Sequence, residues 1–218
     1  MAIKIALAGN PNCGKTTMFN ALTGANQYVG NWPGVTVEKK EGKLKGKRGK
    51  GEEIIVTDLP GIYSLSPYTL EEVVSRDYIL KENPDVIIDL VDATNIERNL
   101  YLTTQLIETG VPVVIALNMA DLLEKRGIKI DTKRLSMLLD CPIIETSALK
   151  GEGLDKLIDE AVKTAKKSSV DLPKEIFTKE METAITAVKD ILPSSVTEDK
   201  KRWYAVKFLE NDEKVKEA

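Results

Sequence analysis

The octapeptide GNPNCGKT, residues 9–16, limits the possible folds of this chain more than any other stretch. It matches G-x-x-x-x-G-K-[ST], and it lies between a short β-branched run and a helical pattern. Its glycines let the backbone wrap closely around phosphates, Lys15 supplies a point charge, and the Thr16 hydroxyl suits magnesium. We therefore predict a phosphate-binding loop between a strand and a helix. The predicted phosphate contacts in and after this loop are Gly9, Asn10, Pro11, Asn12, Cys13, Gly14, Lys15, Thr16 and Thr17.

Short apolar runs alternate with helical patterns along most of the chain. The predicted strands are Ile3–Ala8, Ile54–Asp58, Val86–Asp92, Val113–Asn118 and Ile143–Thr146. The predicted helices between them are Lys15–Thr23, Leu70–Lys81, Ile96–Thr109, Thr132–Leu139 and Leu154–Lys166. Nearly continuous apolar strands are typical of a parallel sheet that is covered on both faces. The pattern predicts an α/β fold with a mostly parallel, doubly wound sheet and a site at the carboxyl ends of its strands.

Residues 38–53, EKKEGKLKGKRGKGEE, depart from this rhythm. A basic arm that binds nucleic acid is one interpretation of the lysines. The flanking acidic residues and the absence of interleaved aromatic residues argue against it. The glycines supply the positive backbone angles that tight turns require, so we favour an exposed hairpin.

The pattern changes again after Lys167, where SSVDLPKE is typical of a linker. Two further helices are predicted, at Lys179–Leu192 and Glu198–Leu209. In the second, Trp203, Val206 and Leu209 recur at helical spacing and predict a packed apolar stripe. We therefore expect two domains, an α/β domain over residues 1–167 and a small all-α helical subdomain over residues 168–218.

Composition excludes several classes of site. The chain contains no histidine, which removes Ser-His and Cys-His catalysis and histidine-ligated metals. Cys13 and Cys141 cannot form a four-thiolate site and do not indicate a disulfide scaffold. A net charge of −3 gives no basic field for nucleic acid. No apolar run approaches the roughly 18 residues of a membrane span, and MAIKIALAGN lacks a signal-peptide pattern. We expect a soluble intracellular chain.

The next motif is DLPG, residues 58–61, directly after the strand predicted at Ile54–Asp58. The Asp58 carboxylate, beside a phosphate loop, can hold magnesium through a water molecule. Gly61 can offer its backbone N–H to a terminal phosphate because no Cβ stands in the way. An isolated D-x-x-G is most often a turn at the end of a strand. Here its location beside the predicted phosphate loop favours a functional role.

Two motifs at the last two predicted strands suit a nucleobase. In NMAD, residues 118–121, the Asp121 carboxylate can accept two hydrogen bonds from adjacent ring N–H and amino donors, an edge that guanine has and adenine lacks. The alternative is that Asp121 only caps a helix. In TSALKGEG, a backbone N–H at Ser147 or Ala148 can meet the base carbonyl. The predicted guanine contacts are Asn118, Met119, Asp121, Ser147, Ala148 and Leu149.

The order GNPNCGKT, Thr36, DLPG, NMAD and SAL resembles that of Ras-like, translation-factor-class GTP-binding domains over about residues 1–167. The resemblance implies that Thr36 caps magnesium and the γ-phosphate in the GTP state, inside the first switch. The second switch then runs from Asp58 through about Leu70. The implied magnesium ligands are Thr16, Thr36 and Asp58, and the implied phosphate contacts of the switches are Gly34, Val35, Thr36 and Gly61.

A closer resemblance rests on GNWPGVTVE, DLPGIYSLSPYT, VDATNIERNLYLTTQL and KRWYAVKFLEND. Together they are similar to the cytosolic N-terminal region of the ferrous iron transport protein B family. The resemblance implies a GTP-binding domain, a helical domain that modulates nucleotide release, and a membrane-spanning part that this chain lacks. The helical tail is shorter than the family's, which suggests a fragment. The implied partners are GTP, GDP and the membrane-spanning part at the cytoplasmic side of the membrane, with a homo-oligomer as a further expectation and no nucleic acid.

The position that often carries a water-orienting glutamine, directly after D-x-x-G, is Ile62 in this chain. One interpretation is that a potassium ion assists hydrolysis, with Asn12 offering its amide oxygen. The family resemblance suggests this ion, with carbonyls near Gly30 and Trp32 completing its shell. Such an ion would neutralise developing charge where an arginine finger acts elsewhere. Asn12 is alternatively a turn residue that tolerates left-handed backbone.

A second interpretation is a slow switch that needs a partner, with Glu71 or Glu72 helping to place water. Acidic residues also suit the start of a helix without any such role. The predicted catalytic residues are Asn12, Lys15 and Thr36.

The leading hypothesis is a magnesium- and potassium-dependent GTPase that regulates a membrane ferrous iron transporter. A ribosome- or RNA-associated GTPase is the alternative, and a nucleotide sensor that does not hydrolyse GTP is a third. Because Trp32 lies in the first switch, we expect it to be partly exposed and to sense the nucleotide state. Cys13 is expected to point away from the phosphates.

Overall fold

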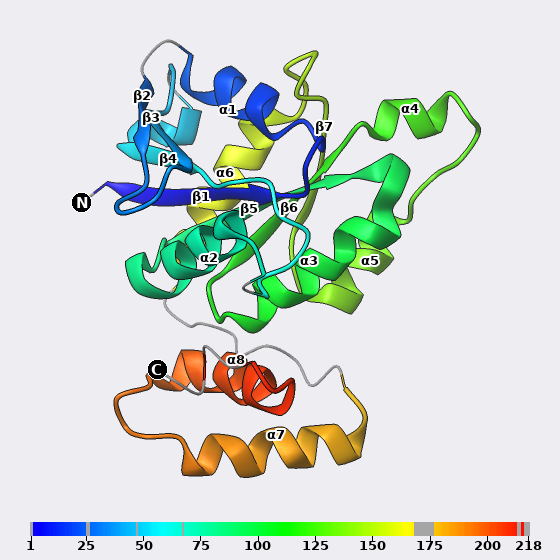
Figure 1. Cartoon of the computed structure of the whole chain (residues 1–218). Coiled ribbons are helices and arrows are strands. Elements are labelled where there is room, and N and C mark those ends of the chain that lie inside the picture. Colours follow the sequence, from blue (N-terminus) through cyan, green and yellow to red (C-terminus); the bar gives the residue numbers. More distant parts are fainter. Residues whose placement is uncertain are drawn as a thin grey trace.

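One mixed sheet of seven strands organises the computed structural model, which describes residues 2–24, 27–46, 48–66, 68–167, 177–212 and 215 (Figure 1). The strand order is β2-β3-β4-β1-β5-β6-β7. From β4 to β7 all neighbours are parallel, whereas β3 is antiparallel to both β2 and β4. The strands are β1 Ile3–Gly9, β2 Gln27–Asn31, β3 Glu38–Lys43, β4 Ile54–Asp58, β5 Val86–Asp92, β6 Val113–Asn118 and β7 Ile143–Thr146.

Helices cover both faces of the sheet, as its apolar strands require. α1 and α6 lie on one face, and α2, α3 and α5 lie on the other (Figure 1). The helical elements of this part are α1 Lys15–Thr23, η1 Arg48–Gly51, α2 Leu70–Asp77, η2 Tyr78–Glu82, η3 Ala93–Asn95, α3 Ile96–Glu108, α4 Ala120–Glu124, α5 Thr132–Leu139 and α6 Leu154–Ala165. Each face has its own core, with Phe19 and Leu157 fully buried on the first and Leu102 and Leu106 on the second. The predicted doubly wound α/β fold is confirmed.

All five predicted strands are present, and two more were missed. β2 was missed because QYVGN is short and combines two polar residues with a glycine. The exposed hairpin predicted at residues 38–53 is wrong, because this range forms β3, which lies inside the sheet between β2 and β4, and the 3-10 turn η1. The helix predicted at Leu70–Lys81 is α2 followed by the π-helical turn η2. There the Tyr78 hydroxyl donates to Thr57 Oγ1 at 3.0 Å.

Two further helices, α7 Lys179–Ile191 and α8 Glu198–Leu209, pack together beneath the sheet domain (Figure 1). The linker predicted between the domains lies within residues 168–176, outside the described residues. Trp203 is buried as predicted, but Leu209 is 41% exposed. The apolar stripe is therefore only partly correct, because α8 turns Lys207 inward instead. No helix of the described part of the chain is long and apolar enough to cross a membrane.

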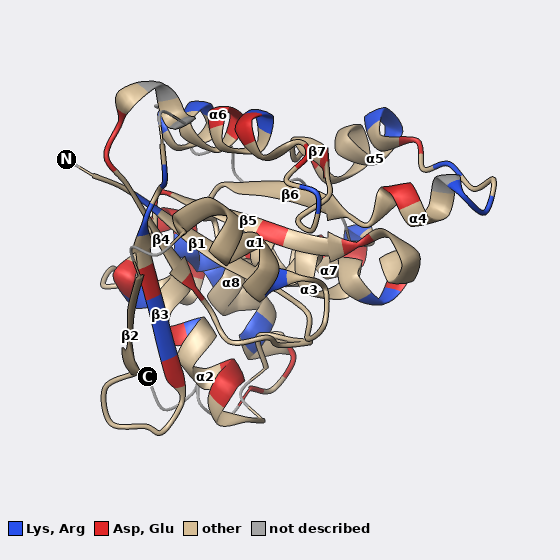
Figure 2. Ribbon diagram, turned by 90° about the horizontal axis from the view of Figure 1, so that it is seen from above, with Lys and Arg blue, Asp and Glu red and all other residues tan. Residues whose placement is uncertain are grey.

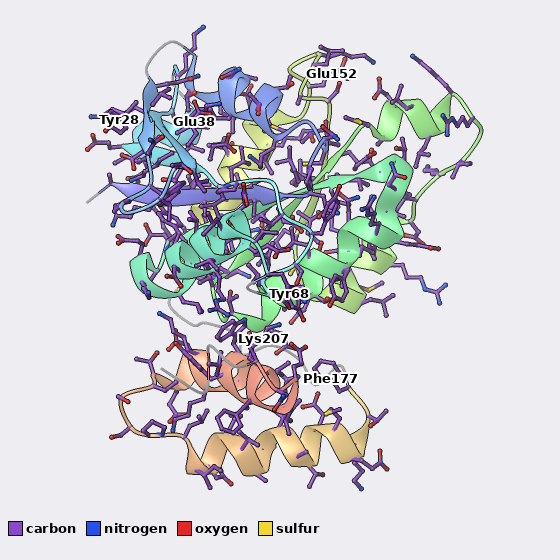
Figure 3. All side chains as sticks on the ribbon, in the orientation of Figure 1. Tyr28, Glu38, Tyr68, Glu152, Phe177 and Lys207 are labelled. Carbon is purple, nitrogen blue, oxygen red and sulfur yellow. The ribbon has the colours of Figure 1, made fainter. Side chains whose placement is uncertain are left out.

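An ion-pair cluster joins α8 to the sheet domain. The Arg202 guanidinium donates to Glu108 on α3 and to Glu182 on α7, each at 2.7 Å at closest, and all three side chains are buried. Figure 3 shows Lys207 and Phe177 near the same junction. Buried charges persist only when they are paired, so this cluster fixes how α8 rests on α3.

Candidate functional site

The loop between β1 and α1 is held by close backbone packing. A Cβ placed on Gly9 would lie 2.8 Å from the carbonyl oxygen of Leu90, so only glycine fits against β5. Asn12 and Gly14 have φ values of 66° and 93°, in the left-handed region. The Gly14 N-cap carries no side chain, which leaves the first N–H groups of α1 facing the loop. This geometry suits an anion at the helix N-terminus.

Lys15 and Asp58 meet across two neighbouring strand ends. Lys15 begins α1 after β1, and Asp58 ends β4, the strand paired with β1. The Lys15 ammonium donates to Asp58 Oδ1 at 2.5 Å, with both side chains largely buried. Burial raises the pKa of Asp58, and the Lys15 charge opposes that rise. The predicted cation and the predicted magnesium ligand thus lie side by side.

DLPG also reaches the loop. Gly61 packs against Pro11, where a Cβ would lie 3.2 Å from Pro11 Cα, and the Ile62 N–H donates to the Gly9 carbonyl at 3.3 Å. The Ile62 side chain is buried in the core, so it has no access to a water molecule. Thr16 and Thr17, in the first turn of α1, are exposed.

Asn118 ties three motifs together. Its side-chain amide donates to the Cys13 carbonyl at 2.9 Å, and its Oδ1 accepts from the Ala148 N–H at 3.0 Å. Because Asn118 is only 2% exposed, these bonds form inside the protein. A Cβ on Gly14 would lie 2.6 Å from Asn118 Nδ2, so this close approach also needs a glycine. The sequence predicted Asn118 as a base contact, and the structure gives it the additional role of a brace.

The remaining predicted base contacts lie around this brace. Met119 adopts left-handed backbone with φ 63° and is the N-cap residue of α4. The Asp121 carboxylate accepts from Lys150 at 2.7 Å, and this hydrogen bond holds its pKa below the usual range. Ser147 bridges to Glu152 through reciprocal backbone bonds, and Leu149 is 89% exposed. The sequence reasoning missed Lys150, although its position in TSALKGEG was a signal.

Asn10 and Cys13 are buried inside the loop. Both polar atoms of the Asn10 side chain lack a hydrogen-bond partner among the described residues. Cys13 is 1% exposed, and burial raises the pKa of its thiol to about 12. Because the thiolate is the reactive form of cysteine, a thiol that stays protonated near neutral pH is inert.

Residues 32–37, predicted as part of the first switch, form the closed end of the hairpin between β2 and β3. The Trp32 N–H donates to the Val37 carbonyl at 2.9 Å, and the Val35 N–H donates to the Trp32 carbonyl at 3.2 Å. Gly34 takes φ 77° at the tip, and Thr36 is exposed. None of the described hydrogen bonds joins Thr36 to the phosphate loop, and its predicted contact with magnesium and the γ-phosphate in the GTP state stays a prediction.

The expectation of a partly exposed Trp32 is wrong for this structure. Trp32 is 8% exposed and stacks edge-on against Tyr78, with ring centroids 5.3 Å apart. Proline and glycine let the turn fold back, so the indole reaches the core beside α2. Gly30, in β2, precedes this turn.

Glu72 has a structural role at the start of α2. It forms a capping box with Thr69, and its carboxylate accepts from the N–H groups of Tyr68 and Thr69. This supports the plain interpretation of that glutamate. Glu71, by contrast, is exposed on the first turn.

Comparison with known proteins identifies the family. The family model described as "Ferrous iron transport protein B" matches residues 3–161, and the one described as "FeoB cytosolic helical domain" matches residues 177–218. The chain belongs to the ferrous iron transport protein B family. The Fe(2+) transporter FeoB of Escherichia coli K12 is 40% identical over 214 residues, covering 96% of this chain and 27% of that protein. The chain thus spans about a quarter of the length of the curated relatives it matches.

Solved structures of this family agree with the fold. An S. thermophilus NFeoB mutant bound to mGDP has a TM-score of 0.93 and 49% identity, covering 100% of this chain and 82% of that one. The cytosolic domain of T. maritima FeoB in apo form has a TM-score of 0.89 and 40% identity, covering 100% and 84%. The sheet domain is therefore a P-loop G domain followed by a helical part. These matches do not favour the alternative of an RNA-associated GTPase.

Proposed function

We propose that the chain binds GTP and GDP, hydrolyses GTP slowly, and regulates a ferrous iron transporter from the cytoplasmic side of the membrane. The observation that carries the proposal is the Asn118 brace, which joins the phosphate loop at Cys13 to the base-contacting segment at Ala148. A nucleotide that spans these segments would place its phosphates at the phosphate loop and its base beside the Asp121 carboxylate. The related S. thermophilus NFeoB, a mutant bound to mGDP, supports this choice of ligand.

Nucleotide binding would require Lys15 to exchange partners. Its ammonium now pairs with Asp58 at 2.5 Å, and a phosphate would draw it towards the loop. The Asp121 carboxylate would likewise exchange its partner, from the Lys150 ammonium to the N–H donors of the guanine edge. The hydrogen bond from Lys150 holds the pKa of the Asp121 carboxyl below its usual range, so this carboxylate is ionised before the ligand arrives.

Magnesium fits the donors at this end of the sheet. The Thr16 hydroxyl and the Asp58 carboxylate come from adjacent elements, and oxygen donors are the ligands that magnesium prefers. In this proposal Thr16 and Asp58 hold the ion and Thr36 joins them when the first switch rearranges. Bound magnesium would neutralise negative charge on the phosphates.

Potassium fits the residues only in part. Asn12 is exposed in the phosphate loop and its amide oxygen is a suitable donor. The Trp32 carbonyl already accepts from Val35, inside the hairpin that also contains Gly30. In this proposal those two carbonyls join the ion only after the hairpin opens, and Asn12, Lys15 and Thr36 are the catalytic residues.

Turnover of GTP and ATP in potassium, in sodium and in neither tests the proposal. We expect GTP to be preferred and potassium to accelerate its hydrolysis. Equal turnover in both salts, together with an Asn12→Ala variant as active as wild type, would refute the potassium mechanism while leaving GTP binding intact. Tight GTP binding without phosphate release under any cation would instead identify a sensor.

The regulatory role rests on the helical part. α8 contacts the G domain through Arg202 and Glu108, and Arg76 on α2 pairs with Asp212 at 3.2 Å. α2 directly follows the second switch, so nucleotide-dependent movement there would reach α8. In this proposal the domains are residues 1–167 and 168–218, and the membrane-spanning part of the transporter is the partner.

A further inference from the structure

The outer edge of β2 is open in the described part of the chain, where β3 is its one strand neighbour. Tyr28 is 65% exposed and Val29 is 53% exposed. Figure 3 shows Tyr28 at the outer margin of the molecule. Proteins usually protect such edges with lysine, proline or a bulge, but QYVGN contains no charge and no proline (Figure 2). This edge can therefore form hydrogen bonds with another strand.

One backbone hydrogen bond fixes the direction in which the polar groups of β2 point. The Trp32 N–H donates to the Val37 carbonyl at 2.9 Å, which places the polar groups of Trp32 towards β3. The register continues without interruption from this pair along the hairpin. Because consecutive residues alternate, Tyr28 and Gly30 also face β3. The N–H and C=O groups of Gln27, Val29 and Asn31 face the open side.

These outward groups match a second copy of the same strand. If two β2 strands run antiparallel about a two-fold axis at Val29, Val29 faces Val29 of the other copy and Gln27 faces Asn31. Each of these pairs exchanges both N–H···O=C bonds, because all three residues present their polar groups outward. An isologous contact of this kind closes after two copies.

The side chains are also self-complementary in this register. Tyr28 then lies opposite Gly30 of the other copy, and Gly30 lies opposite the other Tyr28. Within one chain the Tyr28 ring already lies over Gly30, where a Cβ would be 2.8 Å from Tyr28 Oη, so the tyrosine shields the exposed backbone of the glycine on its own strand. No pair across the axis opposes two charges or two bulky rings.

We propose that two copies of the chain associate through their β2 edges, antiparallel about Val29, and join their seven-stranded sheets into one. The contact is short, so the dimer is weak and depends on concentration. It does not rest on nucleotide binding and is tested without nucleotide.

Disulfide trapping tests the register. Residues on a two-fold hydrogen-bonded pair have Cα atoms about 5.5 Å apart, within the roughly 4.4–6.8 Å that a disulfide spans. Val29→Cys is therefore expected to cross-link at least about tenfold faster than Met137→Cys, a control 69% exposed on α5. The native Cys13 and Cys141 are buried, and burial raises the pKa of each thiol to about 12, so they do not compete. Equal cross-linking rates for the two variants would overturn the proposal.

Sedimentation equilibrium with charge variants tests the contact without a covalent bond. The wild-type mass is expected to rise from 24.1 kDa towards twice that value with concentration. Val29→Lys and Val29→Glu place like charges opposite each other and are each expected to raise the dissociation constant about fivefold or more. Their equimolar mixture is expected to restore dimers, whereas Met137→Lys behaves as wild type. A wild type that stays monomeric, or a Val29→Lys variant that associates as wild type does, would refute the β2 contact. Circular dichroism confirms that each variant is folded.

Discussion

Replacing Asp89 by asparagine is expected to stabilise the protein more at pH 8 than at pH 5. Asp89 lies in the middle of β5 and is 1% exposed. Its carboxylate accepts one described hydrogen bond, from the Thr103 hydroxyl at 2.6 Å. Burial raises the pKa of Asp89 from 3.8 to about 7, and the Thr103 hydrogen bond opposes part of that rise. The folded protein therefore holds a proton that the unfolded chain has already released.

The sign and size of the effect follow from linkage. Between pH 3.8 and about pH 7 the folded state binds more protons than the unfolded state, so the free energy of unfolding falls as pH rises. The full difference, 7 − 3.8, corresponds to about 4 kcal/mol, and about 2–3 kcal/mol of it develops between pH 5 and pH 8. The free energy of unfolding of the asparagine variant does not fall in this way, because its amide does not ionise.

Urea unfolding of both proteins at pH 5 and pH 8 measures the difference. Other titrating groups are present in both proteins and cancel in the comparison. The new amide lacks a partner for its N–H groups, a cost of about 1–3 kcal/mol that is the same at both pH values. Thr103→Val, which removes the donor, is a control expected to steepen the wild-type pH dependence. A difference between Asp89→Asn and wild type that does not change with pH would refute the reasoning.

Four further predictions concern the site and the helical part. Asp121→Asn is expected to weaken GTP binding by about 10–100-fold in calorimetry and to favour xanthine nucleotides, since an amide donates where the carboxylate accepts. Asn12→Ala is expected to lower potassium-stimulated turnover about tenfold or more, to the rate in sodium. In a Trp203→Phe background, the emission maximum of Trp32 is expected at short wavelength with GDP and is expected to shift with a non-hydrolysable GTP analogue. Identical spectra in the two states would mean that Trp32 stays buried in both. Arg202→Met is expected to cost about 3–5 kcal/mol in urea unfolding because it removes the guanidinium that pairs with two buried carboxylates, and an unchanged midpoint would contradict this.

The parallel core of the fold could be predicted because its signals are local. Strands such as Val86–Asp92 are apolar almost throughout, and GNPNCGKT follows the first of them. β2 could not, because five residues with a glycine and polar ends show no period of their own. They form a strand only because β3 offers a partner, and β3 is in turn held by β4.

Exposure was harder to predict than secondary structure. Trp32 is buried because the hairpin closes on Tyr78, a contact between residues far apart in the sequence. In α8 the helical spacing favoured Leu209 for the interior, yet Lys207 is buried and pairs with Glu210 at 2.7 Å. Which face of a helix is inside depends on what the rest of the chain places beside it.

The residue types of the site and their order could be inferred from the sequence alone, because a phosphate loop and a strand-end carboxylate are chemical requirements with fixed spacing. How these residues meet depends on the packing of the sheet. Asn118 joins Cys13 and Ala148, and Lys15 meets Asp58, because parallel strands bring their carboxyl ends to one edge of the sheet. The open edge of β2 belongs to the same category, since a strand has a free side only once the order of the sheet is known.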